Sequence, residues 1–202
     1  MVSVERSWAK VPVLVLISGT GTNMEGLVRY SLADPNCPYA VSKVIADRPC
    51  IGLERAARLG ITAIEFQRRD PEFNEKLLKA AADQDVIVLA GYLSILPSAF
   101  IKAHKGRIIN IHPSLLPRYG GKGMYGLKVH QAVIASADQE SGCTVHLVDE
   151  GVDTGEILLQ RKVAVLPGDT AQILRERILP LEHDCLVEGL LGLVADIKNK
   201  QR

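Results

Sequence analysis

The fold is decided by the stretch VLVLISGTGTN at residues 13–23. Its first five residues form a short apolar run with β-branched side chains, which is typical of a parallel strand buried on both faces. A glycine-rich turn occupies residues 18–23, and helical spacing of apolar residues follows through Met24, Leu27 and Val28. A strand, a tight turn and a helix in this order predict the first unit of an α/β fold.

The same alternation continues beyond this stretch. We expect strands at residues 40–46, 61–66, 86–90 and 107–112 and a helix at residues 51–59. Asp70-Pro71 is a favourable helix start, with Asp as N-cap and Pro in the first turn, for a second helix that runs to about Gln84. This βαβαβαβ series predicts a doubly wound, mostly parallel sheet with helices on both faces.

The last third of the chain has a different pattern. A Gly- and Pro-rich loop at residues 113–126 precedes an expected helix at 127–135 and expected strands at 144–148 and 157–165. A closing helix follows from residue 170 to about 198, and Pro180 is expected to kink or interrupt it. We therefore predict a C-terminal antiparallel extension with a closing helix, within a single Rossmann-like α/β domain over residues 1–202.

Composition and charge exclude several classes of protein. The balance of Lys+Arg 24 against Asp+Glu 23 gives +1, with 47% hydrophobic residues. This argues against a disordered chain and a dedicated nucleic-acid binder. The apolar run at residues 11–17 is too short to span a membrane. The four cysteines are scattered and show no metal-ligand spacing. We expect a cytoplasmic protein with reduced thiols and no metal, nucleic-acid or membrane partner.

The glycine-rich turn at residues 18–23 has two interpretations. The unpaired N–H groups of a helix N-terminus form a ready anion site. Met24 stands where a dinucleotide fingerprint needs its third glycine, and the P-loop sequence is absent, so a single phosphate monoester is favoured over NAD or ATP. The alternative is a tight turn in which Thr22 is an ordinary N-cap.

Polar residues gather at the end of the expected strand 107–112. Asn110 and His112 are two residues apart, so their side chains share one face. They lie at the carboxyl end of a parallel strand, where open α/β sheets bind ligands. Asn can stabilise an oxyanion, and His can donate or accept a proton. A satisfied core histidine is the alternative. Asp153, beside Thr154-Gly155, indicates a shaped turn rather than a solvated loop.

These features together resemble one family. Residues 17–23, 89–92, 110–117 and 144–155 match, in order, the phosphoribosylglycinamide formyltransferases, folate-dependent enzymes of purine synthesis. The strand with Asn110 and His112 and the Asp153 loop mark the wider formyltransferase superfamily. The early phosphate turn and the pair Glu182-His183 narrow the resemblance to this family.

The resemblance implies transfer of the formyl group of 10-formyltetrahydrofolate to the primary amine of N1-(5-phospho-D-ribosyl)glycinamide. Asn110 and His112 would flank the formyl carbonyl and stabilise the tetrahedral oxyanion. Asp153 would orient His112 or an ordered water and assist proton transfer. Because a nearby carboxylate favours a charged imidazole, we expect His112 to be an imidazolium that donates hydrogen bonds rather than a general base.

The resemblance also implies binding residues. The phosphate would lie on Gly21, Thr22 and Asn23, and Glu182 would hold the amine end. The folate would contact the remaining matched positions, Leu93, Ser94, Ile95, Leu96, Val152 and Asp153. The partners implied are these two small molecules, and the protein would be a monomer or a weak homodimer.

Several alternatives remain open at this point. The family often has Arg where Ser94 stands, and a cationic residue of some relatives falls on Leu179, which leaves Arg177 or no cation for the phosphate. In the loop 119–129, Lys122 or Tyr125 is expected to close over substrate. Formyltetrahydrofolate hydrolases, methionyl-tRNA formyltransferases and sugar-nucleotide formyltransferases share the superfamily but are usually longer. Outside it, the alternative is a non-catalytic nucleotide-binding module.

Overall fold

The computed structural model describes residues 10–200 and places seven strands and six helices along them. In chain order these are β1 (Val11–Ile17), α1 (Thr22–Ala33), β2 (Tyr39–Ala46), α2 (Ile51–Arg58), β3 (Thr62–Glu65), α3 (Phe73–Ala81), β4 (Val86–Leu89), α4 (Ser98–Ala103), β5 (Ile108–His112), α5 (Leu127–Ala135), β6 (Glu140–Leu147), β7 (Ile157–Ala164) and α6 (Ala171–Lys200).

All seven strands belong to one sheet with the order β3-β2-β1-β4-β5-β6-β7. The first five pair in parallel, whereas β6 runs antiparallel to β5 and β7 antiparallel to β6. The chain order reverses between β1 and β4, which opens a crevice at the carboxyl ends of these strands. The predicted doubly wound sheet with an antiparallel extension and a closing helix is confirmed. That residues 1–202 form a single domain stays a prediction.

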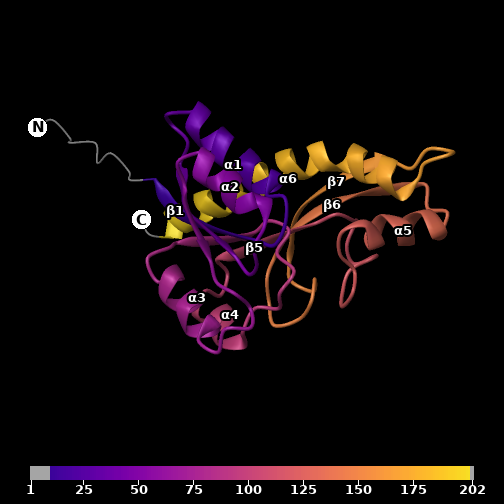
Figure 1. The fold of residues 1–202 in the computed structure, drawn as a ribbon. Helices are drawn as coiled ribbons and strands as arrows, with labels where there is room; N and C mark the ends of the chain where they lie inside the picture. The colour runs from indigo at the N-terminus through magenta and orange to yellow at the C-terminus, as the bar shows by residue number, and fades with distance from the viewer. Residues whose placement is uncertain (1–9, 201–202) are drawn as a thin grey trace, which may run out of the picture.

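Helices cover both faces of the sheet and enclose two cores (Figure 1). On β1, Val13, Val15 and Ile17 point into one core, and Leu14 and Leu16 point into the other. Such alternation is the period-two geometry of a strand. The first core lies under α1, α2 and α6, and the second lies under α3 and α4. Because β1 is buried on both faces, its continuous apolar sequence is a requirement of its central position.

Several expected boundaries were wrong. Asp70 lies in a turn, where its side chain accepts the N–H of Glu72, and the helix begins at Phe73 and ends at Ala81 instead of near Gln84. Strand β6 begins at Glu140, four residues before the predicted start. Pro180 does not interrupt α6, which is helical throughout Ala171–Lys200.

Helix α4 was not predicted. It has only six residues and its N-cap position is Pro97, without a side-chain cap. Phe100 and Ile101 on this helix are buried in the second core. No helix among the described residues is long and apolar enough to cross a membrane.

Candidate active site

The turn between β1 and α1 presents backbone N–H groups at a helix start. Gly21 adopts φ 73° as the N-cap residue, and no side chain caps the helix. A Cβ at Gly21 would lie 2.8 Å from the Cα of Gly52, so the close approach of α2 also requires glycine here. Thr22 is the first helical residue, so the alternative in which it is an ordinary N-cap was wrong. The turn therefore has the geometry of an anion site.

A buried carboxylate from α6 contacts this turn. Asn23 Nδ2 donates to Glu182 Oε2 over 2.7 Å, and both residues are buried. Burial raises the pKa of Glu182, although Asn23 and the nearby Arg175 act in the opposite direction. The Oδ1 of Asn23 is buried without a hydrogen-bond partner. The turn and α6 therefore form one polar wall of the site, in which Asn23 Oδ1 can accept a further hydrogen bond.

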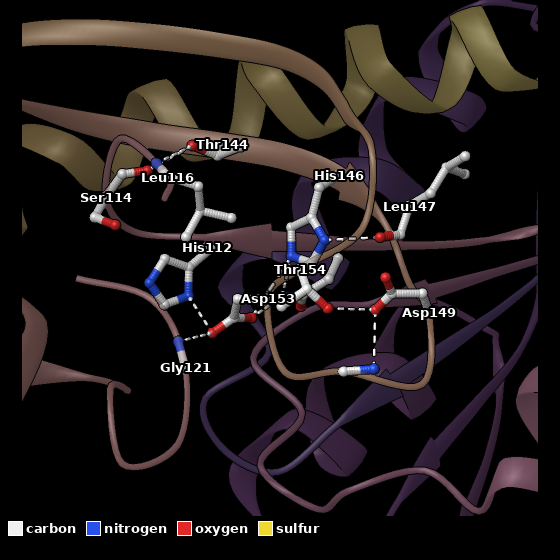
Figure 2. A network of polar contacts seen from close by, with 12 residues as sticks. His112, Ser114, Leu116, Gly121, Thr144, His146, Leu147, Asp149, Asp153 and Thr154 are labelled. Carbon is white, nitrogen blue, oxygen red and sulfur yellow. Dashed lines mark hydrogen bonds and ion pairs between the residues drawn. The ribbon is translucent and has the colours of Figure 1, made fainter. Parts of the chain in front are cut away.

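The pairing of β5 with β6 brings the next group of side chains together. In this register Asn110 lies opposite His146 and His112 lies opposite Thr144. Figure 2 shows His112 and His146 on either side of Asp153, which reaches toward them from the loop between β6 and β7. Asn110 Nδ2 lies 3.4 Å from Asp153 Oδ1. The sequence-predicted trio Asn110, His112 and Asp153 is thus assembled in one place.

The two ring nitrogens of His112 have different neighbours. Nε2 lies 2.8 Å from the carbonyl of Tyr119, and because a carbonyl only accepts, this nitrogen carries a proton. Nδ1 lies 3.5 Å from Asp153 Oδ2. Burial lowers the pKa of His112 below its ordinary value, and it outweighs the raising effects of Asp153 and the Tyr119 carbonyl. The expected imidazolium was therefore wrong, since His112 is neutral at pH 7 with an unprotonated Nδ1.

Asp153 is held in an unusual backbone conformation. Its φ is 58°, in the left-handed region that Asp tolerates better than most residues. The N–H of Gly121 donates to its Oδ2 over 3.0 Å. Burial opposes ionisation of Asp153, but His146, His112 and the Gly121 N–H together hold its pKa below the ordinary value. Asp153 is consequently a carboxylate at neutral pH beside a neutral imidazole.

Sequence reasoning missed His146. Its Nδ1 donates to the carbonyl of Leu147 over 2.8 Å, and its Nε2 lies 3.0 Å from Asn110 Nδ2. In neutral His146 the proton is therefore on Nδ1, and Nε2 accepts from the Asn110 amide, which orients that amide. The signal was present, because His146 is a buried-strand histidine between the apolar Val145 and Leu147, shortly before the Asp153 loop.

One cavity of about 590 Å³ joins these groups. Every site residue predicted from the sequence lines it, namely Gly21, Thr22, Asn23, Leu93, Ser94, Ile95, Leu96, Asn110, His112, Val152, Asp153 and Glu182. The structure therefore brings both ends of the predicted site together.

The expected folate wall, residues 93–96, combines exposed apolar side chains with a serine that is hydrogen-bonded to a neighbouring carboxylate. Leu93 is 45% and Ile95 is 63% exposed, so both present apolar surface toward the cavity opening. Ser94 donates its hydroxyl to the buried carboxylate of Asp47. Ser94 thereby ties this wall to the end of β2. Within the described part of the chain, no cluster of ligand side chains suits a metal ion.

The reversed strand order and this polar cluster define a doubly wound α/β protein with its ligand site at the carboxyl ends of the strands. Residues 11–190 match the family described as formyl transferase, and the chain belongs to that family.

Individual relatives carry more specific names. A chloroplastic phosphoribosylglycinamide formyltransferase of Vigna unguiculata is 42% identical over 187 residues, covering 89% of this chain and 59% of its own length. A trifunctional purine biosynthetic protein adenosine-3 of Drosophila melanogaster is 40% identical over 191 residues, covering 90% of this chain and 14% of its own length. The chain thus spans 59% and 14% of these two curated relatives.

A solved structure matches over nearly its whole length. The phosphoribosylglycinamide formyltransferase of Brucella melitensis has 39% sequence identity and a TM-score of 0.84, and the match covers 93% of this chain and 97% of that one.

Proposed function

We propose that this chain transfers the formyl group of 10-formyltetrahydrofolate to the primary amine of N1-(5-phospho-D-ribosyl)glycinamide. The observation that carries the proposal is the single cavity that holds an anion-binding helix start at one end and the Asn110, His112 and Asp153 cluster at the other. Its lining combines the donors that a phosphorylated amine needs with an apolar wall that suits a folate. The names of the similar proteins support the same reaction.

Asn110 stabilises the negative charge that develops on oxygen. When the amine attacks the formyl carbon, the carbonyl electrons move to the oxygen and form a tetrahedral oxyanion. The Asn110 amide nitrogen lies 3.0 Å from His146 Nε2 and donates to Asp153 Oδ1 over 3.4 Å, and the oxyanion takes the place of the longer of these two contacts. Neutral His112 has only one N–H, which the Tyr119 carbonyl already accepts. In this proposal Asn110 is therefore the first donor to the oxyanion, whereas the sequence suggested a shared role with His112.

His112 and Asp153 move the proton. The attacking nitrogen becomes positively charged, and unprotonated Nδ1 of His112 accepts its proton. The Asp153 carboxylate beside Nδ1 stabilises the imidazolium so formed. Collapse of the intermediate breaks the bond from the formyl carbon to N10 of the folate, and His112 returns the proton to N10. The products are formylated glycinamide ribonucleotide and tetrahydrofolate.

The remaining lining residues bind the two substrates in this proposal. Gly21, Thr22 and Asn23 receive the phosphate, and Glu182, which is hydrogen-bonded to Asn23, accepts from N–H or O–H groups of the ribonucleotide beside this turn. The folate lies on the wall from Leu93 to Leu96 and against the Val152-Asp153 backbone. A folate-linked formyl donor is what the family implies, and 10-formyltetrahydrofolate is the donor we propose.

One assay tests the proposal against its competitors. The protein is mixed with 10-formyltetrahydrofolate alone, with the ribonucleotide amine, or with an amino sugar nucleotide, and tetrahydrofolate and formate are measured. Tetrahydrofolate that forms only with the amine acceptor supports the transferase. Formate released without an acceptor identifies a hydrolase, and transfer only to an amino sugar nucleotide identifies a sugar-nucleotide formyltransferase. No reaction in any mixture identifies a binding module.

The cytoplasmic location, the monomeric or weakly dimeric state, and the lack of nucleic-acid and membrane partners stay predictions from the sequence. One relative is named as chloroplastic, so location varies among similar proteins. Sedimentation of the purified protein measures the oligomeric state.

A further inference from the structure

Arg175 is a cationic residue of α6 that the proposed reaction leaves without a role. It lines the cavity together with Leu179 and Glu182, which lie one and two turns further along the same helix. Among residues 10–200, no hydrogen bond or ion pair engages its guanidinium. A partly buried arginine usually has an anionic partner, because its charge loses water. A guanidinium facing a cavity without one is therefore suited to an anionic ligand.

The other candidate cation on this helix is already engaged. The Arg177 guanidinium binds Asp169 through both terminal nitrogens and also donates to the carbonyl of Ala164. Arg177 is not among the residues that line the cavity. Leu179, which also lines the cavity, is apolar and cannot supply a charge. Of the three positions on α6, Arg175 is therefore the one that offers a positive charge to the cavity, in place of Arg177 and Leu179.

The position of Arg175 along the cavity follows from its neighbours. Its charge acts on the carboxyl of Glu182, and Glu182 Oε2 accepts from Asn23 in the glycine-rich turn. Helix α6 packs beside α1, which begins at that turn (Figure 1). Arg175 therefore faces the same end of the cavity as the start of α1.

Other groups at this end do not supply a positive charge. His130 is 1% exposed, and burial lowers its pKa to about 4, with Arg175 and His112 adding to the effect. It is consequently neutral at pH 7. Lys122 is the other cationic residue among those that line the cavity, and it lies exposed in the loop before α5.

We propose that Arg175 binds the phosphate of the ribonucleotide substrate, opposite the N–H groups at the start of α1, and so determines preference for a phosphorylated amine. The proposal rests on the proposed function for the identity of the substrate. A guanidinium presents paired N–H donors that match phosphate oxygens, and the helix start supplies donors from the other side.

The test compares Arg175→Gln with the wild-type enzyme on the ribonucleotide and on the corresponding ribonucleoside, which lacks the phosphate. We expect KM for the ribonucleotide to rise about 10- to 100-fold, as for loss of one charged hydrogen-bonded contact, with kcat little changed. KM for the ribonucleoside and for 10-formyltetrahydrofolate should stay the same. Arg175→Lys should recover part of the loss, because it restores the charge without the paired donors.

Arg177→Gln is the matched control, since it removes the same charge two residues away and outside the cavity. Its KM values should equal those of the wild type. If Arg175→Gln raises KM for ribonucleotide and ribonucleoside equally, or leaves both unchanged, the proposal is wrong. Ribose 5-phosphate binding, measured by calorimetry, separates this outcome from failure of the proposed function. If ribose 5-phosphate binds the wild-type protein and binds Arg175→Gln more weakly, Arg175 holds the phosphate even if no formyl transfer occurs. If ribose 5-phosphate binds both proteins equally, the proposed role of Arg175 is wrong.

Discussion

At the scale of single residues, the protonation state of His112 depends on two opposing effects. Burial disfavours the imidazolium, while Asp153 at 3.5 Å favours it, and burial prevails in the free protein. From the sequence alone we expected the carboxylate to dominate, because burial cannot be judged from neighbours in the chain. In the free protein, His112 therefore has an unprotonated Nδ1 that can accept a proton. The neighbouring Asp153 carboxylate can then stabilise the imidazolium.

Asp153→Asn should therefore lower kcat by about 10²–10⁴-fold, since the amide cannot stabilise the imidazolium formed during transfer. Folding should be intact, as judged by the circular dichroism spectrum. Glu156→Gln is the control, because this exposed carboxylate lies in the same loop but not among the residues that line the cavity. Turnover by Asp153→Asn at the level of the control would exclude Asp153 from the chemistry.

The pH dependence of kcat provides a second test of His112. In the proposed mechanism the active form of His112 is neutral, so kcat should fall as pH decreases through the pKa of His112, which lies below the ordinary value of 6.5. In Asp153→Asn this acid limb should move to still lower pH, because the carboxylate that raises the pKa is gone. An acid limb that moves upward in the variant would contradict a base role for His112.

At the scale of elements, the sequence predicted those parts that local pattern determines. The two-sided burial of β1 requires a continuous apolar run, and the glycine-rich turn requires Gly21 at a positive φ, so both were predictable. Helix α4 escaped prediction because six residues without a capping side chain carry too little periodicity. The link between Asn110 and His146 depends on the register of β5 with β6, which tertiary pairing sets.

The loop that carries Asp153 depends on a close approach at Gly155. A Cβ there would lie 1.8 Å from the carbonyl oxygen of Leu147. Gly155→Ala should therefore displace the loop and lower kcat by about 10²-fold, because small misplacements of catalytic groups are costly. It should also lower the free energy of unfolding by about 1–3 kcal/mol.

The control for this substitution is Gly192→Ala, whose added Cβ would meet nothing within 4 Å on α6. Urea denaturation should show a gain of about 0.5–1 kcal/mol from helix propensity, with kcat unchanged. Equal effects of the two substitutions on kcat would argue against a requirement for glycine at residue 155.

At the scale of the whole molecule, burial of His130 couples stability to pH. The folded state keeps this histidine neutral down to about pH 4, whereas the unfolded chain binds a proton below about 6.5. The free energy of unfolding should therefore fall by up to about 3 kcal/mol between pH 6.5 and 4. Urea denaturation across this range should show a shallower decline in His130→Gln, and an unchanged slope would exclude His130 as the source.

The polar cluster also joins parts of the molecule that differ in how firmly they are held. Asn110 and His112 lie on β5, which is hydrogen-bonded to a strand on each side, whereas Asp153 lies in the loop between β6 and β7. Such loops open at lower free energy than central strands. Inactivation in mild urea should therefore precede loss of the far-ultraviolet spectrum, so the enzyme's working range is narrower than its folded range.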